Sequence, residues 1–306
     1  MAMIRDDGQI NPNSYLIDAV HEGLRRGHAV YLLKSGDRGT CLIDAGTKSS
    51  AAVIYDKLKA LDTWPLDKII FTHSHWDHTQ GIELLRKKAA ETNDAIDVIA
   101  SEKAMPYLKD QSCNICFGTD QMPYVNIEDV RGVKNGDSIT MGDDFAVTIV
   151  DTPGHTVDHI SIYDEKNSSI YVGDTIGMKW SADLLISNPN STFWDEEDYR
   201  KSIATIKDLK VGTIGLTHFG CLTGDDAKTF LDESVSTYEK WMDIFDKNRD
   251  RTGDLPFMVG MLWETVYPKV PKKLRMRADP GLTDAVELAA NTSTNRGIHR
   301  VYSADW

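Results

Sequence analysis

Four potential metal ligands fall within one short segment, and this cluster constrains the chain more than any other feature of its sequence. The segment Thr72-His-Ser-His-Trp-Asp-His78 follows the apolar run 67–72, which we predict to be a buried strand. Imidazole and carboxylate groups suit Zn and, with more carboxylate, Fe or Mn. Three of the nine histidines in the 306 residues crowd this loop, so ordinary packing explains the cluster poorly. One loop can thus supply ligands to two metals.

The motif His73-x-His75-x-Asp77-His78 resembles the signature of the metallo-β-lactamase-fold superfamily. The resemblance leads us to expect three more ligands in order along the chain: a His after a turn, an Asp after the next strand and a His at a later strand end. The sequence supplies them as His155 in Thr-Pro-Gly-His-Thr, Asp174 in Tyr-Val-Gly-Asp-Thr and His218 in Leu-Thr-His-Phe-Gly. All seven positions of the pattern are filled.

This resemblance covers roughly residues 28–225 and implies a four-layer αβ/βα sandwich with the site between the sheet edges. It implies two divalent metal ions, with Zn expected and Fe or Mn as alternatives. The implied ligands are His73, His75 and His155 for the first metal, Asp77, His78 and His218 for the second, and Asp174 as the bridge. A shared carboxylate holds two ions close enough to trap one hydroxide, the expected nucleophile. Asp77 and Asp174 are accordingly the expected catalytic carboxylates.

Local patterns agree with an α/β chain. The runs 29–34 and 40–46 predict a β-hairpin, and 101–130 an irregular, partly helical insertion long enough to be functional. We predict a catalytic domain over 1–225 and a helical extension over 226–306 that shapes the substrate pocket. Further strands are expected at 67–72, 96–100, 137–141, 145–150, 159–163, 169–172 and 211–216, helices at 49–61, 81–92, 197–209, 225–248, around 256–266 and around 282–291, and an irregular loop at 184–194.

The function that the resemblance implies is hydrolysis of a thioester, ester or lactone. Asp174 differs from the Cys that many true β-lactamases of this fold use at the second site. The Pro-Gly-His-Thr-Val-Asp-His run and the helical extension are most similar to quorum-signal thioesterases of the PqsE type, with lactonases and glyoxalase II as more distant relatives. Two alternatives stay open: a diiron protein that binds or reduces oxygen or nitric oxide, and a metal-containing regulatory protein with vestigial hydrolase activity.

Several other residues have a structural and a functional interpretation. His159 is expected to pack rather than to bind metal, and Cys113 and Cys116 to be ordinary thiols rather than a redox pair or a metal clip. The basic run 272–277 is expected to be a solvated face, with an anionic substrate tail as the alternative. Aromatic and apolar side chains near the ligands are candidates for a pocket wall or lid: Trp76, Met178, Trp180, Phe193, Trp194 and Phe219.

The composition limits the classes of partner that we expect this protein to bind. The formal net charge of −13 opposes binding to nucleic acid or to an acidic membrane surface. No apolar stretch approaches the length of a membrane span, and the first residues do not resemble a secretory signal. We therefore expect a cytoplasmic protein with a small-molecule substrate, and apolar positions on the C-terminal helices would suit a homodimer.

Overall fold

Two seven-stranded sheets form the centre of the molecule. The computed structural model describes residues 3–36, 38–117, 124–142, 144–181, 183–187, 189 and 193–294, without the side chains of 38, 115, 116, 277 and 291–294. The first sheet contains, in spatial order, β2 (Gly8–Asn11), β3 (Ser14–Asp18), β4 (Ala29–Ser35), β5 (Arg38–Ile43), β6 (Lys68–Ile70), β7 (Asp97–Ser101) and β8 (Val130–Val133). The second contains β1 (Met3–Ile4), β16 (Gly220–Thr223), β15 (Thr213–Leu216), β12 (Ser169–Tyr171), β11 (Ile160–Asp164), β10 (Ala146–Asp151) and β9 (Ser138–Thr140).

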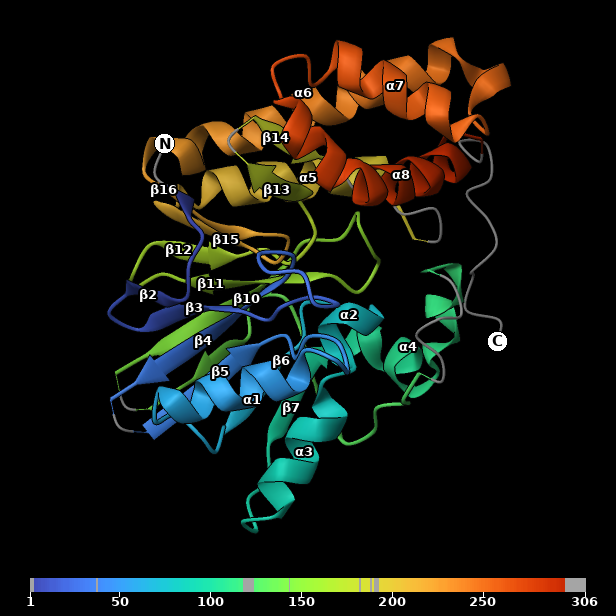
Figure 1. The fold of residues 1–306 in the computed structure, drawn as a ribbon. Coiled ribbons are helices and arrows are strands. Elements are labelled where there is room, and N and C mark those ends of the chain that lie inside the picture. The colour runs from blue at the N-terminus through green and yellow to red at the C-terminus, as the bar shows by residue number, and fades with distance from the viewer. Residues whose placement is uncertain are drawn as a thin grey trace.

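Helices cover the outer face of each sheet (Figure 1). Helices α1 (Ala51–Ala60) and α3 (Ile82–Ala90) pack on the first sheet through a cluster that includes Ile54, Leu58 and Leu85. The second sheet is covered by α5 (Glu196–Asp208) and α6 (Asp225–Lys247), and α7 (Leu255–Thr265) and α8 (Lys272–Thr294) pack against α6 and against each other. A third cluster lies between the sheets. The four-layer αβ/βα sandwich with a helical C-terminal extension is therefore confirmed.

The interior between the sheets ties the first sheet to the strand ends of the second. Tyr31 on β4 is buried and donates its hydroxyl to two carbonyl oxygens, Leu216 O at 2.8 Å and Gly220 O at 2.9 Å. Its ring lies 4.8 Å from that of Tyr171. These contacts fix the β15–β16 turn, which carries His218.

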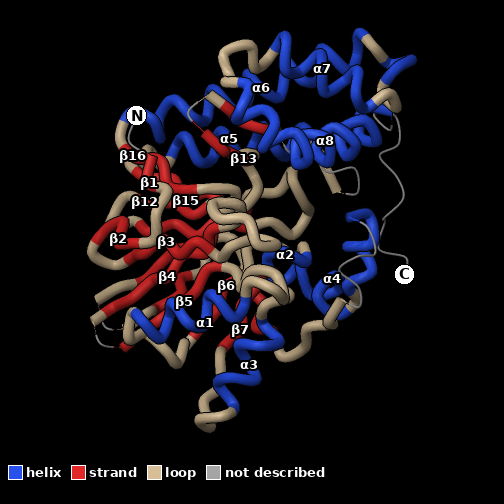
Figure 2. Tube along the Cα trace, in the orientation of Figure 1, coloured by secondary structure: helices blue, strands red, loops and turns tan. Residues whose placement is uncertain are grey.

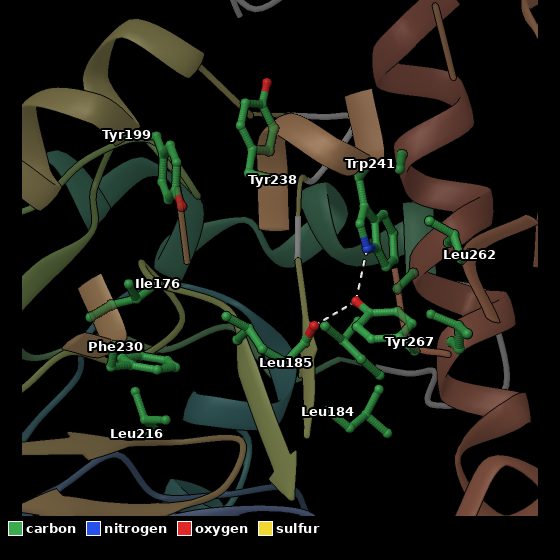
Figure 3. Close-up of a cluster of buried hydrophobic side chains, with 14 of the residues drawn as sticks. Ile176, Leu184, Leu185, Tyr199, Leu216, Phe230, Tyr238, Trp241, Leu262 and Tyr267 are labelled. Carbon is green, nitrogen blue, oxygen red and sulfur yellow. Dashed lines mark hydrogen bonds between the residues drawn. The ribbon is translucent and has the colours of Figure 1, made fainter. Parts of the chain in front are cut away.

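The C-terminal helices share one apolar core with the second sheet rather than forming a separate one. Figure 3 shows part of this cluster, in which Trp241 of α6 and Tyr267 meet Leu185. Trp241 Nε1 donates to the Tyr267 hydroxyl at 2.8 Å, and that hydroxyl donates to Leu185 O. These bonds satisfy the polar atoms of two aromatic side chains in an apolar environment.

The predicted elements are largely confirmed, including the β4–β5 hairpin, and the insertion contains a short 3₁₀ turn, η1 (Glu102–Ala104), then α4 (Met105–Lys109) and a second 3₁₀ segment, η2 (Gln111–Phe117). A third 3₁₀ turn, η3 (Arg249–Arg251), follows α6. The prediction of an irregular loop over 184–194 was wrong in its first part, because β14 (Leu184–Ile186) pairs with β13 (Met178–Ser181). The strands β13 and β14 are too short to show an alternating pattern of apolar and polar residues.

The last helix was also predicted too short. Helix α8 begins at Lys272, so the basic run 272–277 forms its first turns instead of separating two helices. Pro280 lies inside the helix, and a proline after a charged stretch favours a helix start at that point in a sequence-based prediction. The strands β1, β2, β3, β8 and β16 were not predicted, since each is short or lacks a strongly apolar face.

Candidate metal centre

Loops at the ends of strands from both sheets carry the seven predicted ligands. The segment after β6 leads into the four-residue helix α2 (Trp76–Thr79), with His75 at its N-cap. His155 lies between β10 and β11, and the parallel pair β12 and β15 ends just before Asp174 and His218. Figure 2 shows these connecting loops gathered beside α2 at one end of the sandwich. Parallel strands place their carboxyl ends at one edge, so residues far apart in sequence come together there.

Three imidazoles converge to form the first donor group, His73, His75 and His155. His75 Nδ1 lies 2.9 Å from His73 Nε2 and 3.1 Å from His155 Nε2. Adjacent ligands on one zinc ion, with bonds of about 2.0–2.1 Å, lie at similar separations. All three side chains are buried. This arrangement fits one metal ion held by three neutral imidazoles.

The second donor group contains Asp77, His78 and His218. His218 Nε2 lies 3.3 Å from Asp77 Oδ2, and His78 Nε2 lies 3.7 Å from the same oxygen. These mixed nitrogen and oxygen donors suit Zn, Fe or Mn.

Asp174 faces both groups. Its Oδ2 lies 3.5 Å from His78 Nε2 and 3.6 Å from His218 Nε2 in the second group, and 3.7 Å from His155 Nε2 in the first. Its other oxygen, Oδ1, is buried and has no hydrogen-bond partner among the described side chains. A buried carboxylate oxygen without a donor is costly, and a bound cation would satisfy it. The residues present therefore fit a pair of metal ions that share Asp174.

Asp44, which the sequence analysis did not single out, orients the ligand loop. It follows β5 and is buried, and its Oδ2 accepts a hydrogen bond from His78 Nδ1 at 2.8 Å. Its Oδ1 accepts from the backbone N–H of Thr72, also at 2.8 Å. A carboxylate on the far ring nitrogen fixes the tautomer and leaves Nε2 for a metal. The signal in the sequence was a polar residue directly after a strand, as at the other ligands.

His159 and Asp158 also position the ligands. His159 Nε2 accepts a hydrogen bond from the backbone N–H of Asp174 at 3.1 Å, and its Nδ1 lies 2.8 Å from Thr175 Oγ1. Asp158 Oδ2 accepts from the backbone N–H of Ser74 at 2.9 Å. His159 lies outside both donor groups, and its hydrogen bonds hold the Asp174 turn.

The ligand histidines differ in the direction in which their surroundings shift the pKa. Burial lowers the pKa of His73 and His75 well below the usual value, and neighbouring imidazoles lower it further. Burial also acts to lower the pKa of His78, but Asp77, Asp174 and Asp44 outweigh it and raise that pKa well above its usual value. The pKa of His218 is raised likewise, because Asp174 and Asp77 outweigh burial. His73 and His75 are thus neutral at pH 7, whereas His78 and His218 favour protons until a metal replaces them.

The six predicted pocket residues lie in different environments. Trp76 begins α2, and its ring lies 5.7 Å from that of His21. Phe219 is fully buried in the cluster between the sheets. Phe193 is also buried, 5.0 Å from the Tyr107 ring. The remaining three are partly buried against the core under the C-terminal helices: Met178, Trp180 and Trp194. Their role in binding a substrate stays a prediction.

One aromatic residue beside the ligands was missed by the sequence analysis. Phe117, at the end of η2, places its ring 4.8 Å from that of His75. In the same insertion, Asn114 is fully buried and accepts a hydrogen bond from the backbone N–H of Trp76 at 2.9 Å. The insertion therefore reaches the metal ligands, as its length suggested.

The remaining candidates are Cys113, Cys116 and the basic run 272–277. Cys113 Sγ accepts a hydrogen bond from Asn114 Nδ2 at 3.7 Å, and the Cys116 side chain lies outside the described residues. In the basic run, Arg275 donates to the carbonyl oxygens of Val270, Tyr267 and Pro268. Arg275 thereby holds the loop before α8. No described helix is long and apolar enough to cross a membrane.

A family model described as the metallo-beta-lactamase superfamily matches residues 23–218. This match covers more than half of the chain and includes all seven predicted ligands. The chain belongs to the metallo-β-lactamase superfamily. Among curated proteins, it is 28% identical over 169 residues to a hydroxyacylglutathione hydrolase of Brucella anthropi, covering 53% of this chain and 56% of that protein. A hydroxyacylglutathione hydrolase of Rhodopseudomonas palustris is 28% identical over 137 residues, with 45% and 43% covered. The chain spans about half the length of the curated relatives it matches.

Solved structures of superfamily members share the fold. A metallo-β-lactamase family protein of Thermus thermophilus matches with a TM-score of 0.61 at 18% identity, covering 94% of this chain and 95% of that one. An archaeal superfamily protein of Sulfolobus tokodaii matches with a TM-score of 0.58 at 21% identity, covering 73% and 85%. Both matches support the architecture. The match to the Thermus protein covers 94% of this chain and therefore extends into the C-terminal helices.

Proposed function

We propose that this superfamily member is a dinuclear metallohydrolase that cleaves a thioester, ester or lactone. The observation that carries the proposal is the position of Asp174, whose Oδ2 lies 3.5–3.7 Å from imidazole nitrogens of both donor groups. Zn is the metal we expect, and Fe or Mn suits the same donors.

Two ions bound there would polarise an acyl carbonyl and lower the pKa of a bound water from about 15.7 towards about 7. The chain's own residues would then hold and orient this centre. Asp44 and the carbonyl oxygen of Gly27 fix the outer nitrogens of His78 and His218, with Gly27 O accepting from His218 Nδ1 at 2.8 Å. No Ser or Cys nucleophile is needed, and water adds across the acyl bond to give an acid and a thiol or alcohol.

The substrate class rests on two observations. The curated relatives named above are hydroxyacylglutathione hydrolases, and this similarity makes a thioester the first candidate substrate. Phe117 packs beside the ligand His75, and Trp76 packs beside His21. Apolar side chains at these positions suit an acyl or aromatic group.

The test is metal content by mass spectrometry on protein purified without added metal, with a panel of thioesters, esters, lactones and phosphodiesters assayed on the same sample. We expect about two metals per chain and turnover of acyl substrates. Two irons with a visible absorption band and no hydrolysis would favour the oxygen or nitric oxide alternative. Two metals without turnover on any substrate would favour a regulatory protein.

Replacing the shared carboxylate tests the centre directly. Asp174→Ala removes a donor from both groups, so we expect the rate of hydrolysis to fall by more than about 100-fold and the bound metal to fall below two per chain. Circular dichroism checks that the variant is folded. A folded variant with the rate of the original protein would contradict the proposal.

A further inference from the structure

His28 is a fully buried histidine beside the second donor group, outside the seven predicted ligands. It directly precedes β4, and two backbone bonds fix its position. Its carbonyl accepts from the N–H of Ala19 at 2.8 Å, and the next N–H, that of Ala29, donates to Thr217 O at 2.8 Å. The second bond places His28 next to the strand end that carries His218.

The His28 ring points at the second group. Its centroid lies 5.1 Å from the ring of His78 and 5.1 Å from the ring of His218, with the rings edge to face in both pairs. One ring nitrogen of His28 lies within 4.8 Å of the donor atoms of Asp77, His78 and His218. Opposite ligands on an ion with bonds of about 2.1 Å are about 4.2 Å apart, so a small contraction brings all four into one coordination sphere.

Neither ring nitrogen of His28 has a hydrogen-bond partner within the described part of the chain. A buried imidazole has one donor and one acceptor to satisfy, and leaving both unpaired costs free energy. The other histidines that orient or form the site have partners: His78 has Asp44, His218 has Gly27 O, and His159 has the Asp174 N–H. His28 is the exception, and it lies beside the proposed site of the second metal.

We propose that His28 is an additional ligand of the second metal. This inference rests on the proposed function, because it requires that a second metal binds. With His28, the second ion has four protein donors before Asp174 is counted. Four donors already fill a tetrahedral zinc site, so this set suits an ion that accepts five or six ligands.

The test compares metal binding by the full chain and by His28→Phe, which keeps a ring in place but removes both nitrogens. Zn²⁺ and Mn²⁺ are each titrated into the metal-free protein by calorimetry. We expect the first metal to bind both proteins equally and the second to bind His28→Phe at least about tenfold more weakly. X-ray absorption should count six imidazoles over two metals in the original protein and five in the variant. His28→Ala repeats the test if the larger ring disturbs packing.

His21→Gln is the matched control. The His21 ring stacks on that of His28 at 5.9 Å, but His21 lies outside the donor group. We expect its second-site affinity to be unchanged; a loss equal to that in His28→Phe would overturn the proposal, because a disturbed loop would explain both. Unchanged affinity in both His28 variants would overturn it as well. If the original protein binds fewer than two metals, the proposed function itself fails, and this result precedes any comparison of variants.

Discussion

At the level of single residues, the hydrogen bond from His78 to Asp44 prepares a ligand before any metal binds. Asp44 is buried and holds both the imidazole and the backbone of Thr72. We expect Asp44→Ala to weaken metal binding by about 10–100-fold, since loss of such an outer partner frees the ligand ring. Metal titration with a competing chelator measures this change.

Asp164→Ala is a suitable control for that variant. Asp164 is also fully buried, but its oxygens accept from Asn167 and lie outside both donor groups. Both variants should unfold at lower denaturant concentration, and only Asp44→Ala should lose metal affinity. Equal affinity in the two variants would mean that Asp44 supports the fold and not the metal ligands.

The two donor groups should differ in how metal binding depends on pH. His73 and His75 have lowered pKa values and are neutral at pH 7, whereas the pKa values of His78 and His218 are raised. A metal must displace protons from the second group, so its affinity falls as the pH falls, and binding releases protons.

Calorimetry at pH 7 in buffers of different ionisation enthalpy counts these protons. We expect release of about one proton or more when the second metal binds and less when the first binds. Equal release at the two steps would contradict the assignment of charge between the groups.

Among the secondary-structure elements, the turn after β12 shows how backbone conformation positions a ligand. Gly173 has a φ of +49°, and a Cβ at this position would lie 2.5 Å from His159 Nε2 and 2.9 Å from Thr72 Oγ1. A side chain would therefore be strained by its backbone and would displace residues that hold Asp174 and the ligand loop.

We expect Gly173→Ala to lower the free energy of unfolding by roughly 1–3 kcal/mol and to weaken metal binding. Gly253→Ala is the control, because Gly253 has no neighbour within 4 Å of an added Cβ and no positive φ. Urea denaturation measures both variants. A Gly173→Ala protein as stable as Gly253→Ala would show that the turn tolerates a side chain.

Across the molecule as a whole, α6 closes the core of the second sheet. Phe230 and Trp241 of α6 are buried in the same cluster as Ile214 and Leu216 of β15. Each buried side chain of this size contributes about 1.5–3 kcal/mol, so the sheet depends on the extension. The division into residues 1–225 and 226–306 stays a prediction, and the shared core indicates that the first part depends on the second.

We therefore expect a chain ending at residue 224 to bind a hydrophobic dye and to lack a cooperative unfolding transition, because the outer face of the second sheet would be exposed to water. Fluorescence with such a dye and thermal denaturation measure this. A truncated chain that unfolds cooperatively with the stability of the full chain would show that the extension is a separate unit.

The resemblance of the seven-ligand motif to the superfamily was sufficient to predict the sandwich, and local sequence patterns predicted most of its strands and helices. Periodicity and turn residues are local features of the sequence. The seven predicted ligands between His73 and His218 lie in short motifs, each of which can be recognised separately. The strands β13 and β14 were not predicted because they are too short to show an alternating pattern, and the start of α8 was not predicted because Pro280 lies inside the helix.

Only the tertiary structure shows which other side chains contact the seven predicted ligands. His28, Asp44 and Phe117 lie far from one another in sequence and carry no motif, yet all three lie beside the histidines. Their positions follow from the register of strands in a folded sheet and from the path of an irregular insertion. Both depend on packing between distant segments, which a local pattern does not encode.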